Sequence, residues 1–131
     1  MQFTNDGKRS QAQPVQLEDV EKRFITKLKA LGYKVERNVT LEGKFKTKYT
    51  FDLLARRSNG LVSYVIAIGI IKHDNGQPIG LAEVFEFNDK CYNCDIWDKV
   101  LIALPELDSV AAQFAHGQQI KILSEESLKE F

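Results

Sequence analysis

The seven residues 65–71 read Val-Ile-Ala-Ile-Gly-Ile-Ile and carry no polar side chain. A strand that faces water on one side alternates apolar and polar residues, whereas a strand covered on both faces is apolar throughout. This run therefore predicts a central strand with other elements packed on both of its faces. Gly69 stands inside it, although glycine weakens a strand and often marks a bulge or a close approach. We expect Gly69 to make space either for a bulky neighbour between helix and sheet or for a ligand beside the sheet.

The residues before this run predict one helix and two further strands. Apolar residues recur at three- and four-residue steps from Leu17 to Leu31, which is the period of an amphipathic helix, and Gly32 is a natural stop for it. Turn residues at Gly43 and at 58–60 then separate three strand-like segments. The expected strands run over residues 33–41, 47–56 and 61–71.

The residues after the run predict helices that alternate with short strands. Pro78 is suited to the first turn of a helix in which Leu81, Val84 and Phe85 are expected to face inward. The later elements expected are a strand at 100–104, a helix at 107–115 ended by Gly117, a strand at 120–123 and a helix from Ser124. The resulting order, αβββαβαβα, predicts an α/β fold whose mixed sheet is flanked by helices on both faces.

The composition is that of an ordinary globular domain. Hydrophobic residues make up 44% of the chain and charged residues 27%, with 18 acidic residues against 18 basic ones. We expect residues 1–14 to form a flexible tail and residues 15–131 a single domain. The N-terminus lacks the apolar core of a signal peptide, and no stretch approaches the roughly 20 apolar residues of a membrane span. We therefore expect a cytoplasmic protein that makes no membrane contact.

Several of these patterns, taken in order, resemble the PD-(D/E)xK superfamily, in particular its Mrr-like branch, which includes archaeal Holliday-junction resolvases. The first helix carries Glu21 and leads into Gly32-Tyr33, and a hairpin then presents Asp52 beside apolar residues. The resemblance covers roughly residues 17–128. It implies a restriction-endonuclease-like core, a role in DNA metabolism and assembly as a homodimer.

The chain departs from this superfamily at the central strand, where an acid and, two residues on, a lysine are expected. Gly69 stands where the acid belongs and Ile71 where the lysine belongs. Phosphodiester hydrolysis needs a divalent ion held by about two carboxylates, and the lysine adds charge near the scissile phosphate. The resemblance thus leaves Glu21, Asp52, Gly69 and Ile71 as remnant positions of a catalytic site and implies no cofactor.

An alternative interpretation restores the lost groups from neighbouring positions. Lys72 or Lys48 would replace the lysine, and Glu83 or Glu86 from the following helix would replace the acid. Asp52 would then be a ligand of Mg²⁺ in an active endonuclease. Otherwise we expect Asp52 to pair with a nearby arginine or lysine.

Basic and aromatic residues alternate in the stretch Lys44-Phe45-Lys46-Thr47-Lys48-Tyr49. This pattern suits phosphate contacts combined with stacking on bases. With Arg56, Arg57 and Lys72, these lysines are the candidate nucleic-acid-binding residues, and DNA is the expected partner. The alternative is a hairpin whose charges prevent its edge from pairing with other chains.

Cys91 and Cys94 have the spacing of half a zinc site. The two histidines, His73 and His116, do not lie at a matching spacing. A metal shared between subunits, a redox pair and two unrelated thiols are the remaining interpretations.

The sequence thus predicts a catalytically inactive nuclease-fold protein that binds nucleic acid or a protein partner of DNA metabolism. The two alternatives are an active metal-dependent endonuclease with relocated catalytic residues and a protein-interaction module with no nucleic-acid role.

Overall fold

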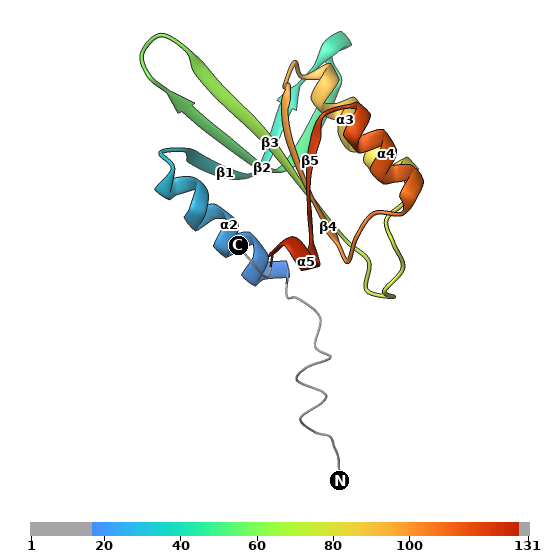
Figure 1. Cartoon of the computed structure of the whole chain (residues 1–131). Coiled ribbons are helices and arrows are strands. Elements are labelled where there is room, and N and C mark those ends of the chain that lie inside the picture. Colours follow the sequence, from blue (N-terminus) through green and yellow to red (C-terminus); the bar gives the residue numbers. More distant parts are fainter. Residues whose placement is uncertain (1–16, 129–131) are drawn as a thin grey trace.

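The central sheet has five strands in the order β1-β2-β3-β4-β5 in a computed structural model that describes residues 17–128 (Figure 1). β1, β2 and β3 are antiparallel, whereas β3, β4 and β5 run parallel. The strands are β1 (Lys34–Glu42), β2 (Lys48–Ser58), β3 (Ser63–Lys72), β4 (Asp98–Leu104) and β5 (Ile120–Ser124). The helices are α2 (Leu17–Ala30), the 3₁₀ turn η2 (Lys44–Lys46), α3 (Leu81–Asn93), α4 (Ser109–Gly117) and α5 (Glu125–Leu128). The predicted order and the mixed sheet are confirmed.

β3 occupies the middle of this sheet, and helices cover both of its faces (Figure 1). Val65, Ala67 and Ile71 belong to the apolar core under α3 and α4. Ile68 and its neighbours of the same parity, Ile66 and Ile70, belong to the core under α2 and α5. The absence of polar residues from 65–71 is explained, because each face of the strand contributes to a separate core.

The helices form two layers. α2 buries Val20, Phe24 and Leu28 against one face of the sheet and ends before Gly32, whose φ of +93° an L side chain would resist. α3 and α4 cover the other face, and Asp108 caps α4 because its Oδ1 accepts a hydrogen bond from the Ala111 N–H at 2.8 Å. No helix among the described residues is long and apolar enough to cross a membrane.

Three local predictions were wrong. The helix starts at Leu81 rather than at Pro78, because Ile79 is held in a bridge with Leu107. Leu81 and Phe85 were expected to face inward but are 40% and 56% exposed, and Phe87 is buried instead, since the inward stripe of α3 runs through residues 84, 87 and 91. β3 starts at Ser63, which leaves Leu61 exposed in the preceding turn.

Both strands of the β1–β2 pair switch faces at Asp52. Asn38 lies opposite Asp52 in the register and has a φ of +50°, a conformation that asparagine tolerates better than most residues. On one side of this point Leu53 packs in the α2 core, and on the other side Phe51 and Val39 pack in the α3 core. An uninterrupted strand would keep residues 51 and 53 on one face. The switch turns the far end of the hairpin toward α3.

Gly69 lies directly beneath the ring of Phe87. A Cβ at position 69 would stand 2.7 Å from Phe87 Cδ1 and 3.1 Å from Leu101 Cδ1, which is closer than carbon atoms normally approach. Of the two interpretations of Gly69, the one in which it makes space for a bulky neighbour is confirmed. This close approach fixes the height of α3 above the sheet.

Replacement of Gly69 by alanine is expected to lower the free energy of unfolding by about 1–3 kcal/mol, because the added methyl group overpacks the interface with Phe87. The double variant Gly69→Ala, Phe87→Leu should recover part of this loss. Urea unfolding followed by circular dichroism measures both. Gly117→Ala is the matched control, since a Cβ there meets no atom within 4 Å. Equal effects at positions 69 and 117 would contradict the packing argument.

Candidate functional site

A cleft of about 230 Å³ opens between the sheet and α3, close to the point where β1 and β2 switch faces. We call it the Asp52 cleft. Its lining residues come from β2, β3, α3 and β4 and are Asp52, Gly69, Ile70, Ile71, Glu83, Glu86, Phe87, Lys90 and Leu101. Three carboxylates and one lysine therefore share a small space whose floor is apolar.

Asp52 is oriented by the backbone of β3. The ladder between β2 and β3 ends at the pair Leu53–Ile68, and beyond it the Asp52 Oδ2 accepts a hydrogen bond from the Ile70 N–H at 2.8 Å. The carboxylate thus takes the place of a strand carbonyl. Within residues 17–128 no basic side chain pairs with it, so the expected ion pair with an arginine or lysine was wrong.

α3 contributes one polar stripe to the cleft. Glu83, Glu86 and Lys90 follow one another at three- and four-residue steps, which places them on one side of the helix. Glu83 Oε1 lies 2.7 Å from His73 Nε2, and the Gln77 carbonyl accepts from Nδ1 of the same ring at 3.1 Å. Glu83 is thereby held at the rim, whereas Glu86 is exposed.

Lys90 is the member of the cleft that sequence reasoning missed. Its Nζ donates a hydrogen bond to the Thr50 carbonyl at 2.7 Å and lies 5.3 Å from the centre of the Phe51 ring. This contact ties α3 to the part of β2 that has turned toward it. The spacing of Glu83, Glu86 and Lys90 in the sequence places them on one side of a helix. Only the structure shows that this side of α3 faces the cleft.

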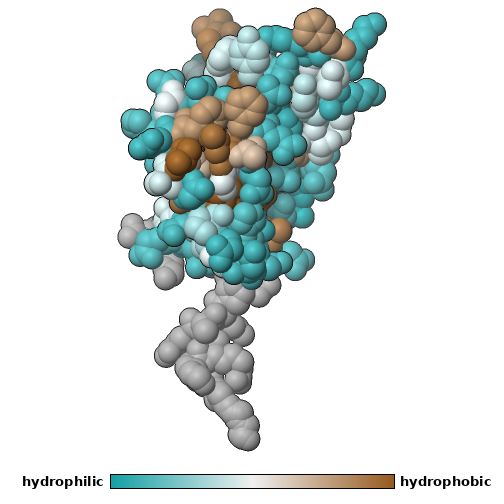
Figure 2. Space-filling view, turned by 90° about the vertical axis from the view of Figure 1, so that its right-hand side faces the viewer, coloured by the Kyte–Doolittle hydropathy of each residue, from teal (hydrophilic) through white to brown (hydrophobic). Residues whose placement is uncertain are grey.

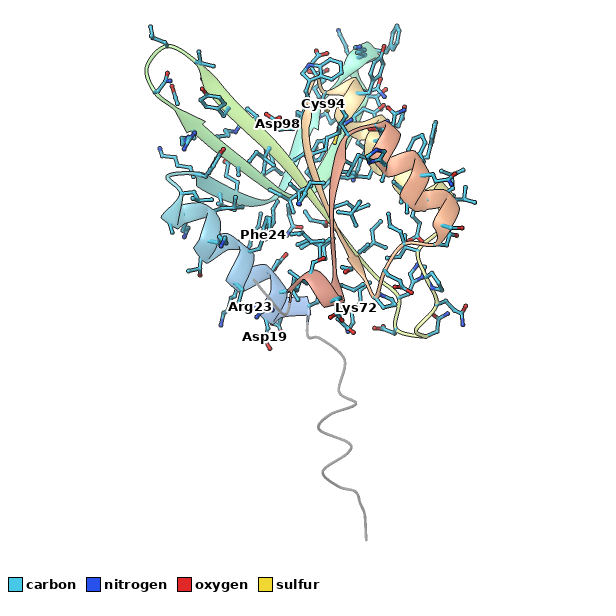
Figure 3. The ribbon with its side chains drawn as sticks, in the orientation of Figure 1. Asp19, Arg23, Phe24, Lys72, Cys94 and Asp98 are labelled. Atoms are coloured by element: carbon cyan, nitrogen blue, oxygen red, sulfur yellow. The ribbon has the colours of Figure 1, made fainter. Side chains whose placement is uncertain are left out.

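Other predicted catalytic positions lie away from the cleft. Glu21 is on α2, across the sheet, where its carboxylate lies 3.9 Å from Arg37. Lys72 is an even-numbered residue of β3, like Ile68 and Ile70, which face α2. Its Nζ lies 3.4 Å from Asp74 Oδ1, and Figure 3 shows Lys72 beside α5. Lys48 is exposed at the start of β2 and does not line the cleft.

The cleft brings together Asp52, both remnant positions of β3 and the two glutamates proposed as relocated acids. Among the described residues, however, no three His, Cys, Asp or Glu side chains are grouped so that they could hold one metal ion. One oxygen of Asp52 and one of Glu83 already have protein partners. Mg²⁺ requires near-ideal octahedral oxygen ligands, so this arrangement does not fit a magnesium centre.

The candidate nucleic-acid-binding residues fall into separate groups. We call residues 43–48, around η2, the β1–β2 tip, and it carries three lysines. Arg56 and Arg57 lie at the other end of β2, which at roughly 3.3 Å per residue is about 26 to 30 Å along the strand from Lys48. Lys72 is near neither group in Figure 3. One continuous basic face is therefore not formed.

The two arginines are already engaged. Arg56 Nε lies 3.5 Å from Glu36 Oε1. The Arg57 guanidinium lies 5.0 Å from the centre of the Tyr33 ring and 5.2 Å from that of Tyr64. Both arginines thus have structural partners that a DNA phosphate would have to compete with.

Both cysteines are free thiols at the C-terminal end of α3, and Figure 3 shows Cys94 near that end. Burial raises the pKa of Cys91 to about 12, and burial together with Asp95 raises the pKa of Cys94. Zinc binds the thiolate, so raised pKa values oppose zinc binding by this pair. His116 lies in the last turn of α4.

Solved structures with a similar fold include nucleases. A crystal structure of a protein of unknown function, AF1548, matches with a TM-score of 0.67 at 16% identity, covering 85% of this chain and 64% of that one. A repair endonuclease from Pyrococcus abyssi has a TM-score of 0.53 at 12% identity, with 86% and 48% covered. EndoMS in a complex with dsDNA has a TM-score of 0.50 at 14% identity, with 93% and 49% covered.

This chain thus spans between about half and two thirds of the length of those proteins. No protein-family model and no curated protein matches the sequence. The fold is restriction-endonuclease-like, as the resemblance of the sequence implied. It is the α/β form in which a mixed five-stranded sheet is flanked by helices.

Cys94 is expected to react with a disulfide reagent in the native protein at pH 8, and Cys91 only after unfolding, because Cys91 is fully buried. The folded-state pKa of Cys91 lies above its ordinary value, so its stabilising contribution is present below about pH 9 and is lost as the pH rises toward 12. Measuring the rate of reaction with the reagent in the variants Cys91→Ala and Cys94→Ser shows which rate belongs to which thiol. Equal native rates would contradict the assignment.

Proposed function

We propose that this chain is a DNA-binding protein with a nuclease fold that does not hydrolyse DNA. The observation that carries the proposal is the packing of the Phe87 ring on Gly69, which fills the position of the missing acid. Ile71, at the position of the missing lysine, packs in the same apolar core. An acid at position 69 would require the Phe87 ring to move.

The remaining acids support the same conclusion. Glu83 is engaged by His73, and one oxygen of Asp52 is engaged by the Ile70 N–H. Three carboxylates around one lysine give the cleft a negative character, which repels a DNA phosphate. DNA contact is therefore proposed at the β1–β2 tip, where Lys46 and Lys48 are exposed.

An active endonuclease with relocated groups is the alternative. Its supporting observation is that Glu83, Glu86 and Lys90 line the cleft beside Asp52. It would require the side chains of the cleft to rearrange before they could hold a divalent ion, because the described residues contain no such group. Cleavage experiments separate this alternative from the proposal.

Association between two copies, or with a protein partner, stays a prediction. An apolar patch on the outer side of α3 and α4 is the surface that favours it (Figure 2). Leu81, Phe85 and Val110 are exposed there, and the rings of Phe85 and Phe114 are 5.9 Å apart. A protein-interaction module with no nucleic-acid role would use this patch alone.

No cleavage of supercoiled, linear or branched DNA is expected in Mg²⁺ or Mn²⁺, because the acid and the lysine of the central strand are absent. Gel electrophoresis of the products measures this. The alternative, an active endonuclease, would be established if the unmodified chain cleaves DNA and each of three single variants does not. These variants are Asp52→Asn, Glu86→Gln and Lys90→Met. Asp98→Asn is the control, since Asp98 is exposed and does not line the cleft.

DNA binding by the unmodified chain is expected to weaken as salt rises, because lysines at the tip displace counterions from phosphates. The double variant Lys46→Ala, Lys48→Ala should lower the slope of log K against log salt by about 2. Fluorescence anisotropy with a labelled duplex measures the slope. Lys22→Ala, Lys29→Ala removes the same charge from exposed positions on α2 and serves as the control. An unchanged slope in the variant of Lys46 and Lys48 would contradict the proposal that the β1–β2 tip contacts DNA.

A further inference from the structure

Phe45 stands at the β1–β2 tip with 95% of its surface exposed. A buried phenylalanine stabilises a fold by about 1.5–3 kcal/mol, and a ring left in water contributes almost none of this. The fold therefore gives no reason for an aromatic residue at this position.

The backbone of the tip is also unfavourable for the residues that occupy it. Phe45 has a φ of +58° and Lys46 a φ of +62°, so two consecutive residues with side chains adopt the left-handed conformation. Glycine or asparagine would adopt it at lower cost. Strain held in this way is a frequent property of functional segments.

Contacts on both sides hold the tip rigidly. The Gly43 N–H donates to the Thr47 carbonyl at 2.7 Å. A Cβ at Gly43 would stand 2.8 Å from the Asn93 carbonyl oxygen, so the turn lies directly against the end of α3. Lys44 Nζ lies 4.1 Å from the centre of the Tyr92 ring and 4.0 Å from Asp95 Oδ1. The Phe45 ring is thus presented to solvent on a fixed base.

The surroundings of Phe45 match one chemical class of partner. Lys46 and Lys48 flank the ring along the chain and are exposed. Tyr92, which Lys44 covers, makes an edge contact with the exposed Trp97 at a centroid distance of 6.4 Å. Exposed rings among lysines are the combination that binds nucleic acid through stacking and phosphate contacts.

We infer that Phe45 stacks on an unpaired base of the DNA that the tip binds, with Lys46 and Lys48 on the flanking phosphates. This inference rests on the proposed DNA-binding function. A paired base offers its face only after unstacking, which costs a few kcal/mol, so an unpaired base is the preferred ligand. The tip therefore selects DNA that contains a bulge, a gap or a single-stranded end.

The test compares a duplex that contains a three-base bulge with the same duplex fully paired, by fluorescence anisotropy at low salt. Phe45→Ala is expected to weaken binding to the bulged DNA by about 5- to 150-fold, which is the range for loss of one base–aromatic stack. Binding to the paired duplex should change less than about twofold. Phe45→Trp should retain the preference, and in a Trp97→Phe background its fluorescence should be quenched by the bulged DNA.

Leu61→Ala is the matched control, because Leu61 is 94% exposed in the turn before β3, at the other end of β2. If Phe45→Ala behaves like Leu61→Ala on bulged DNA that the unmodified chain binds, the stacking inference fails and the proposed function stands. If the unmodified chain binds neither DNA at low salt, both fail. Thermal unfolding followed by circular dichroism confirms that each variant is folded.

Discussion

The contact between Phe87 and Gly69 determines the arrangement of the rest of the site. Because position 69 carries no side chain, the Phe87 ring reaches the backbone of β3 and seats α3 against the sheet. This position of α3 places the side chains of Glu83, Glu86 and Lys90 in the lining of the cleft. The same contact excludes a carboxylate from position 69, so the packing of the core and the proposed loss of hydrolysis have one cause.

The second constraint is the change of face at Asn38 and Asp52. It ends the β2–β3 ladder at Leu53 and leaves the Ile70 N–H for the Asp52 carboxylate. It also carries the β1–β2 tip toward the end of α3, where Lys44 meets Tyr92. The acidic cleft and the basic tip are therefore neighbours with opposite charge, and DNA contact is proposed at the tip alone.

The architecture could be predicted because its signals are local. The apolar run at 65–71 identified the central strand, and the order of periodic segments identified the mixed sheet. The packing role of Gly69 was one of the two interpretations that the rarity of glycine in such a strand suggested. Leu81 and Phe85 were assigned to the wrong face of α3, and the buried Phe87 was not recognised as a core residue. The start of α3 at Leu81 rather than at Pro78 follows from the bridge between Ile79 and Leu107, which joins residues far apart in the sequence.

The site could be predicted only in part, because its geometry depends on tertiary contacts. Asp52 and the two glutamates were named from the sequence, and they do share a cleft. Lys72 was named for its proximity along the chain, but the alternation of side chains in β3 directs it to the opposite face. Lys90 was missed because its contact with Thr50 requires the change of face in β2. The only sign of that change in the sequence is Asn38, which adopts a positive φ.

The most direct test of the proposed loss of the metal site is a titration of the unmodified chain with Mn²⁺, with the bound ion measured by electron paramagnetic resonance. We expect no saturable binding below about millimolar ion, since the cleft offers no group of carboxylates arranged to hold one. Stoichiometric binding at micromolar Mn²⁺ that Asp52→Asn and Glu86→Gln each remove would contradict it.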